Sequence, residues 1–173
     1  ERRFRASQRD LARLYAGYYI AELLNELTDQ ADPHPDLFDL ADATLQALDG
    51  ECDVAATVLR FELVALRLLG HLPLLDACVQ CGANVSAEIR TSFGLVVGGV
   101  LCAQCRPGQR NVVSLSAAAR QVLARFAAEA ETAELALVPA EVRGEVRGIL
   151  NNYLAHHLGH RPRLHGYLGM LVR

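Results

Sequence analysis

Two Cys-x-x-Cys pairs constrain the fold of this chain more than any other feature of its sequence. The first pair is Cys78 and Cys81, the second is Cys102 and Cys105, and residues 82–101 separate them. A Cys-x-x-Cys turn presents two thiolates to one ion, and two such turns complete the tetrahedral shell that Zn²⁺ prefers. The spacing therefore predicts one zinc ion per chain, held in a module too small for a hydrophobic core of its own.

Four thiolate ligands leave no position for a metal-bound water, so the predicted zinc site is structural and not catalytic. An alternative is that one pair is redox-active, although two pairs at this spacing favour metal binding. Cys52 is the fifth cysteine, and its apolar neighbours indicate a small buried side chain. An odd number of cysteines in a chain without secretory marks favours a metal site over a disulfide framework.

The rest of the chain has the pattern of amphipathic α-helices. Apolar residues recur at three- and four-residue steps, and Pro and Gly residues mark the helix ends. Hydrophobic residues make up 51% of the chain and aromatic residues only 6%, which suits closely packed helices rich in Ala and Leu. The expected helices cover residues 9–30, 35–50, 52–69, a segment ending at 126 that Ser114 or Ser116 caps, 131–137, 139–159 and 164–171.

The third of these helices is apolar on nearly all sides, which predicts that it forms the buried centre of the domain. Glu62 lies within it, and a buried carboxylate is costly unless it is paired. Arg60, Arg67 or a helix end are the expected partners. A catalytic role for Glu62 is not favoured, because no second titratable group is spaced to work with it.

The segment that the cysteines enclose is rich in β-forming residues. Residues 89–93 and 95–97 precede Gly98-Gly99, which predicts a short β-hairpin. The predicted fold class is therefore mainly α: a helical bundle domain with an inserted small zinc ribbon-like module that contains a short β-hairpin. The predicted division is a first helical part at 1–77, a zinc-binding module at 78–106 and a second helical part at 107–173.

Charge is distributed unevenly, although the net charge is only −3. Residues 1–13 carry five arginines against two acids, and residues 143–173 carry five against one. The segment between them carries seven arginines against seventeen acids. Contacts with nucleic acid phosphates are therefore expected at the two ends. The alternative is that these charged ends are simply solvated.

Nothing in the sequence has the length and apolarity of a membrane span or a secretory signal, so a cytoplasmic protein is expected. Glu1 stands where an initiator Met is expected, which suggests a fragment of a longer chain.

The histidines form a second candidate metal site. His156, His157 and His160 lie near a predicted helix end, and His165 follows. The i, i+4 spacing of His156 and His160 can bind a metal, but the Glu of a zincin motif is absent. A partly cationic cluster at the helix end is the favoured interpretation.

Several motifs follow one another in an informative order. A Phe-Glu-Leu helix at 61–63 leads into Gly-x-x-Pro at 70–73 and Cys-x-x-Cys-Gly at 78–82, and Gly-Gly-x-x-Cys-x-x-Cys follows at 98–105. Two segments precede them: Tyr19-Ile20-Ala21-Glu22-Leu23 and Phe38-Asp39-Leu40. Together these motifs span most of the chain, and they resemble the C-terminal part of the RecO family of bacterial recombination mediators.

The resemblance implies a helical domain with a zinc module that follows an N-terminal OB-fold, which this chain is expected to lack. It also implies binding to single- and double-stranded DNA and annealing of complementary strands. The implied partners are RecR and the tail of single-stranded-DNA-binding protein, with which the family loads RecA onto gaps. None of these activities is catalytic, and they imply a cytoplasmic, nucleoid-associated location.

The resemblance and the charge distribution together give candidate contact residues. The tail of single-stranded-DNA-binding protein is acidic with a hydrophobic end, and it is expected in an apolar groove with an arginine at its rim. Arg60 and Arg67 are the candidates there. The arginines near the two ends are the candidate phosphate contacts: Arg2, Arg3, Arg5, Arg9, Arg161, Arg163 and Arg173.

Two other classes of function are alternatives. A zinc-ribbon protein-interaction domain without a DNA role is favoured by the acidic middle of the chain. A hydrolase is disfavoured, because the sequence offers no nucleophile and base pair, phosphate loop or open metal site.

Overall fold

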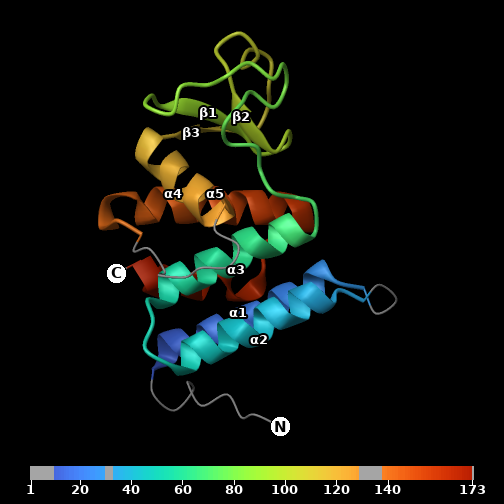
Figure 1. Cartoon of the computed structure of the whole chain (residues 1–173), viewed down its shortest axis with the longest axis vertical. Coiled ribbons are helices and arrows are strands. Elements are labelled where there is room, and N and C mark those ends of the chain that lie inside the picture. Colours follow the sequence, from blue (N-terminus) through green and yellow to red (C-terminus); the bar gives the residue numbers. More distant parts are fainter. Residues whose placement is uncertain (1–9, 30–32, 129–137, 173) are drawn as a thin grey trace.

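The computed structural model describes residues 10–29, 33–128 and 138–172, with the side chains of the last segment described as far as Tyr167. The small sheet lies at one end of the long axis of the molecule, and the helices form successive layers beneath it (Figure 1). The predicted mainly α fold class is confirmed. The helices are α1 (Leu11–Leu27), α2 (Pro35–Asp49), α3 (Val54–Leu68), α4 (Ala117–Ala128), α5 (Ala140–Leu158) and the 3₁₀ helix η2 (Arg163–Val172).

Capping side chains account for the helix boundaries. The Asp10 carboxylate accepts from the Ala12 N–H at 2.9 Å, and the Asp53 carboxylate accepts from the Ala56 N–H at 3.1 Å, so α1 and α3 begin after these residues. The first helix ends at Leu27, earlier than the predicted residue 30, because Thr28 is extended with a φ of −121°. The backbone N–H of Thr28 still donates to the Leu24 carbonyl at 3.1 Å.

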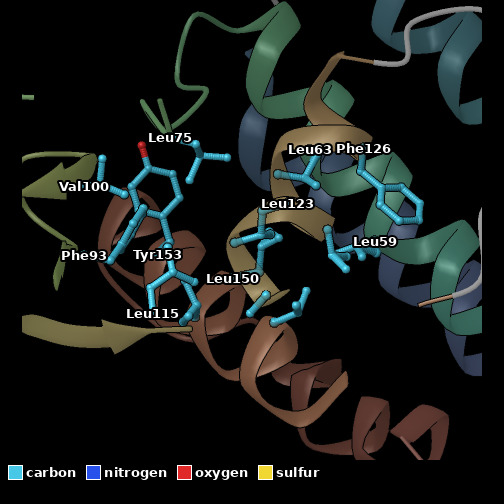
Figure 2. Close-up of a cluster of buried hydrophobic side chains, with 14 of the residues drawn as sticks. Leu59, Leu63, Leu75, Phe93, Val100, Leu115, Leu123, Phe126, Leu150 and Tyr153 are labelled. Carbon is cyan, nitrogen blue, oxygen red and sulfur yellow. The ribbon is translucent and has the colours of Figure 1, made fainter. Parts of the chain in front are cut away.

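Helix α3 is the centre of the domain, as predicted, and ten of its fifteen residues are buried. Its residues Val58 and Phe61 pack with α1 and α2 in one apolar cluster. Leu59 and Leu63 pack with α4, α5 and the sheet in the other, larger cluster (Figure 2). Full burial of a Leu or Phe side chain contributes about 1.5–3 kcal/mol. The two clusters on opposite sides of α3 therefore hold the layers together.

The sheet contains one strand more than the predicted hairpin. Its order is β2-β1-β3, and both pairings are antiparallel. The third strand lies beyond residue 106, so the sheet extends past the range predicted for the zinc module. The strands are β1 (Thr91–Gly94), β2 (Gly99–Leu101) and β3 (Val112–Leu115).

The hairpin exists, but the position predicted for its second strand is wrong. Residues 95–98 form the turn between β1 and β2. The Gly98 N–H donates to the Gly94 carbonyl at 2.9 Å, and Gly98 has a φ of +72°. Because that conformation favours glycine, the chain reverses there and pairing resumes only at Gly99.

The second helical part differs from prediction in detail. Ser116 caps α4 through a 3.2 Å bond from the Ala119 N–H, whereas Ser114 lies in β3. The last predicted helix is a 3₁₀ helix. The helix predicted at residues 131–137 lies outside the described residues.

Candidate metal centre and its supports

The four cysteines come together in the sheet module. Their sulfur atoms all lie within 4.8 Å of one another, and the Cys81 and Cys102 sulfurs are 3.8 Å apart. Four thiolates about 2.3 Å from one tetrahedral ion would be about 3.8 Å apart, so this cluster fits such an ion. All the thiols are free. In the described part of the chain, no other group of three or more His, Cys, Asp or Glu residues brings its ligand atoms together in this way.

Tight backbone turns hold both pairs in place. The Gly82 N–H donates to the Cys78 carbonyl at 2.8 Å, and Gly82 has a φ of +72°, as expected of a glycine in a zinc knuckle. In the second turn, the N–H groups of Cys105 and Arg106 donate to the Cys102 carbonyl at 3.2 Å and 3.0 Å. The local sequence therefore folds each pair so that both sulfurs face the same point.

Two of the thiols have strongly altered acidity. The backbone N–H of Cys102 stabilises the Cys78 thiolate most and lowers the pKa of Cys78 to about 6, against the opposing effect of burial. Hydrogen bonds to Cys81 and then to Cys102 raise the pKa of Cys105 to about 12. A divalent metal ion would displace the thiol protons, because its charge favours the thiolate form of every ligand.

Arg120 on α4 is a support of this site that sequence reasoning missed. Its side chain is buried. Nε donates to the Leu75 carbonyl at 2.5 Å. The two terminal nitrogens donate at 2.7 Å to the carbonyls of Ser86 and Val85. These carbonyls belong to the two segments that flank the first cysteine pair, so Arg120 fixes that pair to the helical domain.

Tyr153 on α5 forms a second connection between the module and the helices (Figure 2). Its ring packs edge-to-face on Phe93, with 5.7 Å between the ring centroids, and its hydroxyl donates to the His71 carbonyl at 2.9 Å. Burial raises the pKa of Tyr153 to about 12. A Cβ atom at Gly98 would lie 3.1 Å from the Tyr153 hydroxyl oxygen. Glycine in this turn therefore allows the close approach of α5.

Glu62 is fully buried, and the partners expected for it from sequence are wrong. The Tyr19 hydroxyl donates to Oε1 at 2.6 Å, and the Arg147 guanidinium donates to Oε2. Arg67 instead donates to the Ala127 carbonyl at 3.2 Å. Burial and then the Glu62 charge raise the pKa of Tyr19 well above its usual value. This network joins α1, α3 and α5. It explains how the buried Glu62 carboxylate is stabilised, without a catalytic role.

The candidate DNA-contact arginines are only partly described. Arg161 and Arg163 are exposed where the chain leaves α5. Glu22 on α1 fixes this segment, because its carboxylate accepts from the Arg163 and Leu164 N–H groups at 2.6 Å and 3.0 Å. The candidate partner-binding residue Arg60 is half-buried. The other candidate contacts lie outside the described residues: Arg2, Arg3, Arg5, Arg9 and Arg173.

The histidines near the end of α5 do not form a metal centre among the described residues. The His157 ring lies 4.7 Å from the His71 ring, measured between centroids. Burial, and then the neighbouring His71 and His156, lower the pKa of His157, which makes it neutral at neutral pH. None of the helices in the described segments is long and apolar enough to cross a lipid bilayer.

Known proteins match the region that contains both the helices and the cysteine cluster. Residues 8–165 match the family model for the C terminal region of recombination protein O. The DNA repair protein RecO of Rhodopirellula baltica is 47% identical over 131 residues, which are 75% of this chain and 48% of that protein. The RecO protein of Anaeromyxobacter sp. (strain K) is 42% identical over 125 residues, 72% of this chain and 49% of its own.

A further relative, RecO of Myxococcus xanthus, is 36% identical over 115 residues, which cover 66% of this chain and 46% of that protein. The chain therefore spans about half the length of the curated relatives it matches. Since the family model matches almost the whole chain, the chain belongs to the RecO family of DNA repair proteins and corresponds to the C-terminal part of its members.

Proposed function

We propose that this chain is the helical and zinc-binding part of a non-enzymatic mediator of DNA repair and recombination. In this role the protein binds single- and double-stranded DNA, anneals complementary strands and acts with RecR to load RecA onto gaps. The gaps are coated by single-stranded-DNA-binding protein, whose tail is the second protein partner. The observation that carries the proposal is the family match over residues 8–165. The corresponding location is the cytoplasm, in association with the nucleoid.

The cysteine cluster is proposed to hold one structural zinc ion. Cys78, Cys81, Cys102 and Cys105 would bind it, and a shell of four thiolates leaves no position for a reacting water. The ion would supply the cross-link that fixes the two knuckles and the sheet between them. We propose that the chain consists of a first helical part at 1–77, a zinc-binding module at 78–106 and a second helical part at 107–173.

DNA contact is proposed at the basic ends of the chain. Arg161 and Arg163 are two residues apart in sequence, and both are exposed. No acidic side chain is paired with either guanidinium among the described residues, so both are available to phosphates. Arg2, Arg3, Arg5, Arg9 and Arg173 stay candidates for the same surface. Arg60 and Arg67 stay the candidate contacts for the tail of single-stranded-DNA-binding protein.

Replacing both Arg161 and Arg163 with Ala is expected to weaken binding of a fluorescent oligonucleotide. Each lost phosphate contact reduces the slope of log affinity against log salt by about 1. Titrations at two salt concentrations measure both effects. Arg125→Ala removes one exposed positive charge from α4, outside this segment, and is the control for a general loss of charge. Unchanged affinity and slope in the double variant would exclude this segment from the DNA interface.

The same titration separates the two classes of function. A protein-interaction domain without a DNA role, which the acidic segment between residues 14 and 142 favours, would give no salt-dependent binding in the unmodified protein. Binding that falls steeply with salt supports the mediator function instead.

The zinc proposal predicts one zinc per chain in the purified protein, and Cys102→Ser is expected to abolish it. Limited proteolysis should then cut within the module, while the helical circular dichroism signal is largely retained, because the helices have their own apolar clusters. Cys52→Ser is the matched control and should keep the metal, since Cys52 lies outside the cluster. A wild-type protein with four reactive thiols and no bound metal would refute the proposal.

A further inference from the structure

A groove of about 510 Å³ lies on one face of the sheet. The strand register places Leu101, Ser92 and Ser114 opposite one another across the three strands, so they share one face of the sheet. Phe93 and Val100 occupy the opposite face and are buried in the core cluster, to which Leu101 also belongs. The row of Leu101, Ser92 and Ser114 forms the floor of this groove.

Two arginines line the groove. Arg90 precedes Ser92 by two residues, and its side chain is 63% exposed. Its Nη1 donates to the Ser114 hydroxyl at 3.1 Å. The nearest carboxylate, Glu145, is 3.5 Å away, but both of its oxygens accept shorter bonds from Ser116, at 2.7 Å and 2.5 Å. Glu145 offsets part of the Arg90 charge, but among the described residues both contacts of Arg90 use Nη1, which leaves its other guanidinium nitrogens open to a ligand.

Arg106 also lines the groove and is exposed. It follows Cys105 directly, and four thiolates around a divalent ion carry a net charge of about −2. Arg106 offsets part of that charge, so it attracts an anion less than Arg90 does. The electrostatic attraction of the groove is therefore concentrated at the Arg90 end, beside the hydroxyls of Ser92 and Ser114.

Part of the remaining lining is apolar, and Ile89, which is 57% exposed, supplies most of its accessible apolar surface. A ligand with one anionic group attached to a less polar body therefore matches the groove. Sites of about 300–1,000 Å³ hold ligands of nucleotide size.

We propose that this groove binds a nucleotide unit of single-stranded nucleic acid, with its phosphate on Arg90 and the hydroxyls of Ser92 and Ser114. The inference rests on the DNA-binding function proposed above and adds a contact site distinct from the two basic ends. The sugar and base lie along Ile89. A single strand fits because its phosphates and bases can enter a narrow groove separately, which paired strands cannot do.

The test measures binding of fluorescent oligo(dT) to the intact, zinc-loaded protein. Arg90→Ala is expected to weaken binding about tenfold, the effect of losing one charge-assisted contact to phosphate. Arg106→Ala should have a smaller effect, and Arg110→Ala, an exposed arginine outside the groove lining, should have none. Zinc content and circular dichroism of each variant establish that it is folded.

Photocrosslinking shows independently where the nucleic acid strand binds. Oligonucleotides that carry a photoreactive thymine analogue should crosslink to the peptide around Ile89, and Arg90→Ala should reduce the yield. Equal affinities of the Arg90→Ala and Arg110→Ala variants would overturn the proposal that the groove binds nucleic acid. The proposed DNA contacts at the chain ends would not be affected by that result. If the unmodified protein bound no oligonucleotide at all, the mediator function would fail as well. Loss of binding to an acidic peptide, with DNA affinity unchanged, would assign the groove to a protein partner and overturn the proposal.

Discussion

Replacing Arg147 with Met is expected to lower the free energy of unfolding by about 3–5 kcal/mol, because it leaves the buried Glu62 carboxylate without its counter-charge. Glu62 is 0% exposed, and within the described segments Arg147 is the one donor to its second oxygen. Water cannot easily replace the guanidinium there. Urea unfolding followed by circular dichroism at 222 nm measures the change.

The control is the double variant Glu62→Leu with Arg147→Met. Replacing a buried ion pair by apolar side chains of similar size is often neutral, so this variant should recover most of the lost stability. Tyr19→Phe removes only the bond to Oε1 and should cost about 1–3 kcal/mol. A loss below about 1 kcal/mol in Arg147→Met would show that the ion pair does not stabilise the packing of α1, α3 and α5.

Replacing Arg120 with Ala is expected to detach the first cysteine pair from the helical domain. The carbonyls of Leu75, Val85 and Ser86 would lose their donor, and each of the two buried ones, on Leu75 and Val85, costs about 1–3 kcal/mol when unsatisfied. Because residues that orient metal ligands change metal affinity by about 10–100-fold, zinc binding should weaken by a similar factor. Competition with a chromogenic chelator measures the zinc affinity, and hydrogen exchange measures the opening of residues 75–86.

Two variants show whether the effect depends on the guanidinium. Arg120→Lys keeps the charge, but a single ammonium cannot match the fork of donors, so it should recover only part of the zinc affinity. Arg125→Ala lies on the same helix and is exposed, and it should behave like the wild type. Unchanged zinc affinity in Arg120→Ala would mean that the turns around the cysteines are fixed without α4.

Local signals in the sequence were sufficient to predict where the helices lie. The spacing of apolar residues located α1 to α5, and residues such as Pro35 and Gly159 stand at their ends. These signals act within a few residues, so they do not depend on the rest of the fold. The strands were less predictable, since β-propensity mainly reflects the surroundings of a strand. The residues Leu95, Val96 and Val97 resemble a strand but form the turn.

The partners of the buried charges could not be predicted, because they lie far away along the chain. Glu62 and Arg147 are 85 residues apart, and Arg120 contacts carbonyls 34 to 45 residues before it. The one available signal was that Arg147 stands three residues before Leu150, on the apolar stripe of α5. An arginine in that position has to be paired once the helix is packed.

The sequence by itself determined the helices, the family and the four cysteines, because each depends on residue types at short spacings or on their order. The tertiary structure decided how the cysteine module is held. It brought the two Cys-x-x-Cys turns together, added β3 to the sheet and directed Arg120 and Tyr153 into the module from α4 and α5. These contacts form only when distant segments pack against one another, since burial is what makes an unpaired carbonyl or charge costly.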